Sequence, residues 1–178
     1  MVLMERKNIF ITGVPGVGKT TLLRKVVAGI PRNVSCKGFF TGEVRESGVR
    51  VGFEMTTLKG HRGLLAHTNL KTGYRVGRYG VDVTGFEDVC LSLFDSTGVH
   101  LFIIDEVGKM ECLSELFCQN MRKLLEAGPP VLGSIALKGG GFIREVKSRT
   151  DVDIVTLTHQ NQDGLAPVLR RKVMNQLG

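Results

Sequence analysis

The sequence predicts an α/β fold in which helices pack on a mostly parallel β-sheet that carries an antiparallel strand insert. Three observations predict it. A glycine-rich loop follows a strand pattern near the N-terminus, strand patterns alternate with helix patterns over the second half, and a strand-rich segment with a hairpin signal lies between them. The 178 residues suffice for one well-packed core, so we expect a single domain over residues 1–178.

The first strand is expected at residues 8–12 and the first helix at residues 20–27. Between them the chain matches the phosphate-binding P-loop pattern G-x-x-x-x-G-K-[ST] at every required position. Glycines let successive N–H groups point at phosphate oxygens, and the helix N-terminus adds partial positive charge. The residues expected to bind a nucleoside triphosphate here are Gly13, Val14, Pro15, Gly16, Val17, Gly18, Lys19, Thr20 and Thr21.

Two residues of this loop have individual roles in that expectation. The Lys19 ammonium would reach the β- and γ-phosphates. The Thr20 hydroxyl would bind Mg²⁺.

The insert follows the first helix. Residues 37–44 and 49–56 flank Glu46-Ser47-Gly48, which is a hairpin signal, and residues 63–67 and 74–77 are short strand candidates. A helix is expected at residues 86–94 because apolar residues recur there at helical spacing.

The second half alternates strands and helices. We expect strands at residues 101–104, 131–136 and 154–157, and helices through residues 113–125, 143–147 and 163–176. The continuous apolar run at 101–104 is typical of a strand covered on both faces. This alternation predicts parallel strands with right-handed crossovers.

An acidic pair, Asp105-Glu106, ends the apolar strand at 101–104. Ligands of open parallel sheets bind at the carboxyl ends of the strands, so Asp105 would face Mg²⁺ as a Walker B residue. Glu106 can orient and deprotonate a water in line with the γ-phosphate. Asp105 and Gly108 also fit the D-x-x-G of switch GTPases, but the chain has no guanine-reading [NT]-K-x-D sequence.

The run Asp105-Glu106-Val107-Gly108-Lys109-Met110-Glu111 resembles the D-E-I-G-K-M-E signature of the thermophile-type nucleoside-triphosphatase family. Residues 38–45 resemble its G-F-[YW]-T-E-E-V-R, and residues 75–79 its R-V-G-x-Y. The resemblance covers essentially the whole chain. It implies a RecA-like three-layer αβα sandwich and Mg²⁺-dependent hydrolysis of ATP, GTP and other nucleoside triphosphates to diphosphate and phosphate.

The sequence departs from the family pattern at two places. Gly42 stands where the family usually has Glu, and Gln160-Asn161-Gln162-Asp163 replaces an E-N-R-N segment. Asn161 is therefore a candidate contact to the base or ribose, and nucleotide preference can differ from that of relatives.

Hydrolysis also needs positive charge on the developing γ-phosphate. Lys109 and Arg45 are candidates for this catalytic role, together with Arg78 and Arg149. Ser134, at the end of a strand, is either a γ-phosphate contact or a buried serine bonded to backbone.

Bulk properties limit the partners and the compartment. The net charge of +7 allows a nucleic-acid surface, but a site for polyanionic nucleotides and ordinary solvated lysines explain it better, because the chain has no Trp and two Tyr for base stacking. No apolar run is long enough to span a membrane. The four cysteines lack metal-ligand spacing and suit a reducing cytoplasm. We expect a cytoplasmic monomer.

The same phosphate cradle leaves two other classes of function open. A nucleotide or polynucleotide kinase would pass the γ-phosphate to an acceptor hydroxyl in place of water. A nucleotide-gated binding module would turn over very slowly and would bind RNA or a partner protein.

Overall fold

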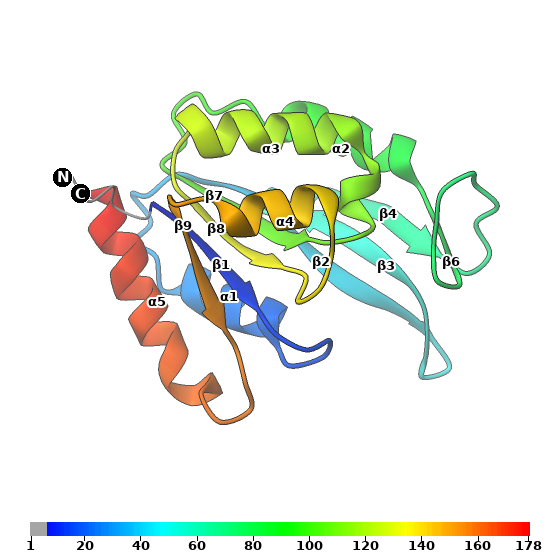
Figure 1. Cartoon of the computed structure of the whole chain (residues 1–178), viewed down its shortest axis with the longest axis horizontal. Helices are drawn as coiled ribbons and strands as arrows, with labels where there is room; N and C mark the ends of the chain where they lie inside the picture. The colour runs from blue at the N-terminus through cyan, green and yellow to red at the C-terminus, as the bar shows by residue number, and fades with distance from the viewer. Residues whose placement is uncertain (1–6) are drawn as a thin grey trace.

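The computed structural model describes residues 7–178, which form one nine-stranded sheet with helices on both faces (Figure 1). The strands follow the order β5-β6-β4-β3-β2-β7-β8-β1-β9 across the sheet. In chain order the elements are β1 (Asn8–Thr12), α1 (Lys19–Ala28), β2 (Cys36–Glu46), β3 (Val49–Thr57), β4 (Arg62–His67), β5 (Arg75–Val76), β6 (Tyr79–Val81), α2 (Val83–Leu93), β7 (Leu101–Val107), the 3-10 turn η1 (Glu111–Leu113), α3 (Glu115–Ala127), β8 (Val131–Ile135), α4 (Gly141–Ser148), β9 (Val152–Thr156) and α5 (Gln162–Leu177).

The sheet has a parallel part and an antiparallel part. Strands β2, β7, β8, β1 and β9 are parallel, whereas β3, β4, β6 and β5 extend the sheet beyond β2 in antiparallel pairs. Strand β8 lies between β1 and β7, with Ser134 paired to Ile11 and Gly133 to Ile104. The carboxyl ends of these three strands therefore meet at one edge, which carries the P-loop, Ser134 and the acidic pair.

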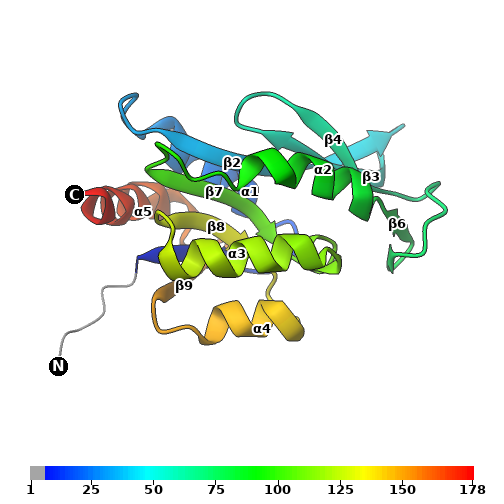
Figure 2. The same cartoon turned by 90° about the horizontal axis from the view of Figure 1, so that it is seen from above.

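Helices α1 and α5 cover one face of the parallel strands, and α2, α3 and α4 cover the other (Figures 1 and 2). Each face has its own apolar core. Ile9 and Ile11 of β1 pack with the α1 and α5 side, whereas Phe10 faces the α2–α4 side. Phe39, Phe86 and Phe117 meet edge-on or tilted in the second core. No helix among residues 7–178 is long and apolar enough to cross a membrane.

The expected fold is confirmed, and the differences are local. Strand β2 continues to Glu46, since the hairpin with β3 pairs up to Glu46 and Val49. Helix α2 begins at Val83, three residues before the expected position, because the Asp82 carboxylate caps it by accepting from the Gly85 N–H. The short strand β6 was not among the expected elements.

Candidate active site

The P-loop connects β1 to α1 at the carboxyl edge of the sheet. Gly16 and Gly18 have φ of 79° and 97°, values that favour glycine. At Gly13 a Cβ would lie 2.7 Å from the Leu157 carbonyl oxygen, so only glycine fits beside the β9–α5 loop. Helix α1 begins at Lys19, which leaves its first N–H groups directed at the loop. This geometry forms a cradle that is suited to an anion.

Asp105 is the buried centre of the site, with 1% of its surface exposed. Thr20 donates its hydroxyl to Oδ2 at 2.7 Å, Ser134 donates to Oδ1, and the Thr41 N–H donates to Oδ2 at 3.3 Å. Burial raises the pKa of Asp105, and these hydrogen bonds oppose the shift. Ser134 thus bonds the carboxylate and not the backbone, and it orients Asp105.

These residues fit a hard divalent cation. The Thr20 hydroxyl and the Asp105 carboxylate lie within hydrogen-bond distance of each other at the cradle. Oxygen ligands of this type suit Mg²⁺, which is commonly held by one or two protein oxygens together with phosphates and water. We take Thr20 and Asp105 as the residues that would hold it.

Glu106 follows Asp105 and faces the P-loop lysine. Its Oε2 lies 3.5 Å from Lys19 Nζ, and the two side chains are 29% and 11% exposed. Lys19 also donates to the Gly13 carbonyl at 3.4 Å. Burial raises the pKa of Glu106, the nearby Lys19 lowers it, and the Asp105 charge raises it. A carboxylate with a raised pKa beside the phosphate cradle is suited to general-base chemistry.

Two residues that sequence reasoning missed lie close to this carboxylate. Glu111, on the turn η1, is buried beside Glu106, and burial raises its pKa to about 8. Lys147 of α4 interacts with Glu106 through its charge, and burial lowers the pKa of Lys147. The family signature contains Glu111, but nothing in its spacing indicates that the chain folds back onto Glu106.

The β9–α5 loop lies against the P-loop. The Gln162 side chain donates to the Val17 carbonyl at 3.1 Å, and the Leu157 N–H donates to the Thr12 carbonyl at 2.8 Å. Asn161 is in the same loop, where its side chain accepts from the Thr158 N–H and donates to the Thr156 carbonyl. The structure therefore brings Asn161 near the cradle, with its amide engaged in holding the loop.

The four candidate cations occupy different places. Lys109 is exposed just past β7 and has no carboxylate partner among the described residues. Arg45 donates to Glu43 and to the Gly48 carbonyl in the β2–β3 hairpin. Arg78 donates to the Arg50 carbonyl and the Tyr79 hydroxyl in the insert.

The fourth candidate, Arg149, lies near the amino ends of β1 and β9, whereas the P-loop follows the carboxyl end of β1. It donates to Asp151, whose carbonyl accepts from the N–H of Asn8 at the start of β1. The suggestion that Arg149 stabilises the γ-phosphate is therefore wrong, because a residue at the amino ends of the strands cannot reach the P-loop at their carboxyl ends.

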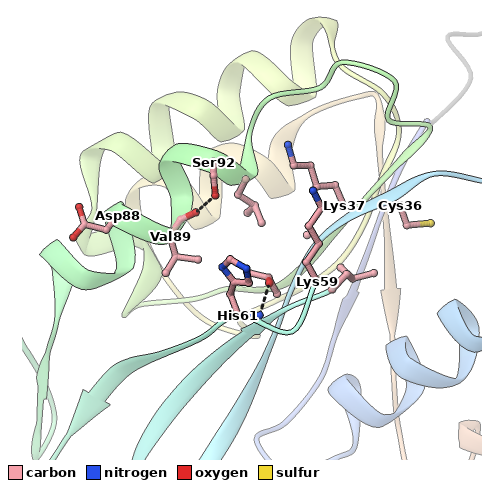
Figure 3. Close-up of a pocket in the computed structure, with 11 residues that line it drawn as sticks. Cys36, Lys37, Lys59, His61, Asp88, Val89 and Ser92 are labelled. Atoms are coloured by element: carbon pink, nitrogen blue, oxygen red, sulfur yellow. Dashed lines mark hydrogen bonds between the residues drawn. The ribbon is translucent and has the colours of Figure 1, made fainter.

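A hollow of about 460 Å³ lies away from the cradle, at the amino end of β2 and beside α2 (Figure 3). Lys37, Lys59, His61 and Asp88 are among its lining residues. Lys37 is bonded to the Asp95 carbonyl. The hollow contains none of the P-loop or acidic-pair residues, so it is separate from the candidate active site.

Comparisons with known proteins identify relatives of this chain. A family model described as NTPase matches residues 8–170. Nucleoside-triphosphatase THEP1 of Thermotoga petrophila is 39% identical over 160 residues, which is 89% of this chain and 88% of the relative. The human cancer-related nucleoside-triphosphatase is 38% identical over 177 residues, covering 90% of this chain and 93% of the relative.

Solved structures match as well. The crystal structure of THEP1 from Aquifex aeolicus has a TM-score of 0.82 and 30% identity, covering 91% of this chain and 96% of that one. The solution structure of the human cancer-related nucleoside triphosphatase has a TM-score of 0.77 and 37% identity, covering 95% of this chain and 98% of that one.

The sheet order, the P-loop and the acidic strand end define a P-loop nucleoside triphosphatase of α/β fold. The chain belongs to the NTPase family, whose members include the thermophile THEP1 enzymes and the human cancer-related nucleoside-triphosphatase. The family resemblance drawn from its motifs is confirmed, and the protein is a hydrolase that acts on nucleoside triphosphates.

Proposed function

We propose that the protein hydrolyses ATP, GTP, CTP and UTP to the diphosphate and phosphate, that it requires Mg²⁺, and that it discriminates weakly among bases. The observation that carries the proposal is the convergence of Lys19, Thr20, Asp105 and Glu106 at one edge of the sheet. A cation, two metal-binding oxygens and a base are the groups that γ-phosphate hydrolysis needs.

In this proposal the P-loop N–H groups and Lys19 bind the β- and γ-phosphates. Thr20 and Asp105 would hold Mg²⁺, which would neutralise part of the negative charge on the phosphates. The hydrogen bonds from Ser134 and from the Thr41 N–H fix the Asp105 carboxylate. Asp105 is thereby pre-oriented, and little side-chain entropy remains to be lost on binding.

Glu106 is the proposed general base. Its carboxylate takes a proton from water as the water oxygen attacks the γ-phosphorus and the bond to the β-phosphate oxygen breaks. Lys19 is ion-paired to Glu106, and a bound triphosphate would compete for this lysine. Capture of Lys19 by phosphate then releases Glu106 to accept a proton.

Two further assignments belong to the proposal. Lys109 and Arg45 are the cations proposed to stabilise charge on the γ-phosphate. Lys109 is exposed just past the acidic pair, whereas Arg45 would first have to leave Glu43. The β9–α5 loop with Asn161 is proposed to border the base or ribose, and it offers no fixed set of polar groups that reads one base.

The remaining expectations stay predictions. We propose a cytoplasmic protein, which its four free cysteines suit, that works as a monomer. We do not assign it a nucleic-acid partner.

Product analysis tests the proposal. The protein is incubated with each of the four triphosphates, with Mg²⁺ or with a chelator, and with or without nucleoside, nucleotide and polynucleotide acceptors. We expect diphosphate and inorganic phosphate at rates that depend on Mg²⁺ and are independent of acceptor. Acceptor-dependent phosphate transfer would favour a kinase, and negligible turnover with salt-sensitive RNA binding would favour a binding module.

A further inference from the structure

Glu111 is a buried carboxyl group that has no role in the reaction proposed above. It lies on the turn η1, which follows β7, and only 5% of its surface is exposed. Among the described residues no lysine, arginine or histidine forms an ion pair with it; the titratable groups that act on it or on which it acts are Asp105 and Glu106 of β7, Cys90 of α2 and the adjacent Cys112. A buried carboxyl without a cationic partner is far more stable neutral than ionised.

The carboxyl groups of Glu111 and Glu106 converge on Gly108. A Cβ built on Gly108 would lie 2.8 Å from Glu106 Oε1 and 2.8 Å from Glu111 Oε2. The other oxygen of Glu106, Oε2, faces Lys19. One side of the Glu106 carboxylate therefore faces the phosphate cradle, and the other side faces Glu111.

Backbone groups also act on the Glu111 carboxyl. The backbone groups of Gly108 and of Glu111 itself lower the pKa of its carboxyl group, against the larger effect of burial. The lack of a side chain at Gly108 leaves the space in which the two carboxyl groups approach each other.

We propose that Glu111 is a positioning residue for hydrolysis: in its neutral form it holds the Oε1 side of Glu106, so that Oε2 is aimed at the attacking water. This inference rests on the proposed role of Glu106 as the base. Two adjacent carboxylates repel each other unless one carries a proton, so the protonated Glu111 lets Glu106 remain ionised and ordered. A bound triphosphate that draws Lys19 away leaves Glu111 as the neighbour that fixes the base.

The arrangement has a consequence at alkaline pH. Burial raises the pKa of Glu111 to about 8. Above that pH a second negative charge forms beside Glu106, and the hold on Oε1 is lost. The wild-type kcat should therefore decline above about pH 8 through the ionisation of Glu111.

Three variants and two controls test the inference, each assayed for kcat, KM and nucleotide affinity from pH 6 to 9. Glu111→Gln replaces the acid with a neutral group of the same shape that still donates. Glu111→Ala removes the group, and Gly108→Ala places a methyl group between the two carboxyls. Gly73→Ala, at a site where a Cβ meets nothing within 4 Å, and Glu115→Gln, on a largely exposed side chain, are the controls.

We expect Glu111→Ala and Gly108→Ala to lower kcat by about tenfold to hundredfold, as small misplacements of catalytic groups do. KM and nucleotide affinity should stay within about threefold, since neither residue touches the phosphates. Glu111→Gln should keep kcat within about threefold at pH 7 and lose the alkaline decline.

Two outcomes would overturn the inference while leaving the proposed function intact. One is a folded Glu111→Gln enzyme as slow as Glu111→Ala, which would mean that Glu111 acts as an ionised group. The other is wild-type kcat and an unchanged alkaline limb in both Glu111 variants. If Glu111→Ala does not fold, Gly108→Ala and Glu111→Gln still decide. Absence of triphosphate hydrolysis by the wild type in the same assay would instead defeat the proposed function.

Discussion

Lys19 Nζ lies 3.5 Å from Glu106 Oε2, so the P-loop lysine and the carboxylate after Asp105 are ion-paired. Each group neutralises the other at a site where both are largely shielded from water. Phosphate oxygens offer the lysine a stronger partner, because they carry more charge than one carboxylate. In the proposed reaction this pair would couple nucleotide binding to the release of Glu106 as the base.

Replacement of the lysine should affect both binding and folding. Lys19→Ala removes the fixed charge on the β- and γ-phosphates, and we expect triphosphate affinity to fall at least tenfold to hundredfold, as for the loss of a charged hydrogen bond of about 1.5–3 kcal/mol. The free energy of unfolding should fall by about 1–3 kcal/mol, because the shielded Glu106 carboxylate is left without its cation. Titration calorimetry and denaturant unfolding measure the two quantities.

Lys25→Ala is the matched control, since Lys25 is exposed on the same helix. It should leave both quantities unchanged. A folded Lys19→Ala protein with wild-type affinity and hydrolysis would contradict the assignment of the P-loop as the triphosphate site.

Asp105→Asn should show a defect in metal dependence. The amide is a weaker ligand than the carboxylate, so the Mg²⁺ concentration for half-maximal activity should rise at least about tenfold, and high Mg²⁺ should partly restore kcat. Stability should also fall by about 1–3 kcal/mol, because the asparagine NH₂ would face a hydroxyl that now donates to Asp105. Activity across a Mg²⁺ titration checks this, with the exposed Asp88→Asn as control. An unchanged Mg²⁺ dependence would remove Asp105 from the metal site.

Base discrimination should be weak. Asn161 is occupied by the backbone of its own loop, and Gln162 bonds the P-loop carbonyl and contacts His159. We expect kcat/KM to vary by less than about a hundredfold among ATP, GTP, CTP and UTP, which corresponds to under about 3 kcal/mol. Steady-state rates with the four nucleotides measure it, and a preference of several thousandfold for one base would show a base-reading element not identified among these residues.

The sequence was sufficient for the parts of the site that depend on local pattern. The P-loop needs glycine, lysine and threonine at fixed spacing, and Asp105-Glu106 ends an apolar strand, so both could be found from the letters alone. The parallel arrangement of their strands then places them at one edge of the sheet. The start of α2 at Val83 was missed, although Asp82 is a typical N-cap residue and Val83 lies three residues before Phe86 on the same apolar face.

Other features depend on the three-dimensional path of the chain. That Ser134 bonds Asp105 follows from β8 lying between β1 and β7, and strand order was not expected from the sequence. The approach of Glu111 to Glu106 follows from the turn at Gly108. Arg149 was named as a candidate cation because spacing along the chain does not tell at which end of the strands a residue lies.

The buried Glu111 should make stability depend on pH. Its pKa in the folded protein is about 8, above the ordinary value of 4.5. Between these values the folded state keeps the proton that the unfolded state loses, so the free energy of unfolding falls as pH rises, by at most about 1.4 kcal/mol per pH unit from this group. Glu111→Gln removes this contribution, and its stability relative to wild type should increase from pH 5 to pH 8. Urea unfolding of both proteins across that range measures it; a difference that stays constant with pH would show that Glu111 is not buried in its neutral form.

The role of Glu106 as the base is the central claim, and single-turnover hydrolysis by Glu106→Gln tests it most directly. Glutamine keeps the size of the side chain but cannot accept the proton, and a positioned general base is worth about 10²–10⁴ in rate. We predict that the chemical step slows by that factor, while triphosphate affinity is retained or rises because a negative charge near the γ-phosphate is gone. Turnover of bound triphosphate within threefold of wild type would contradict the account.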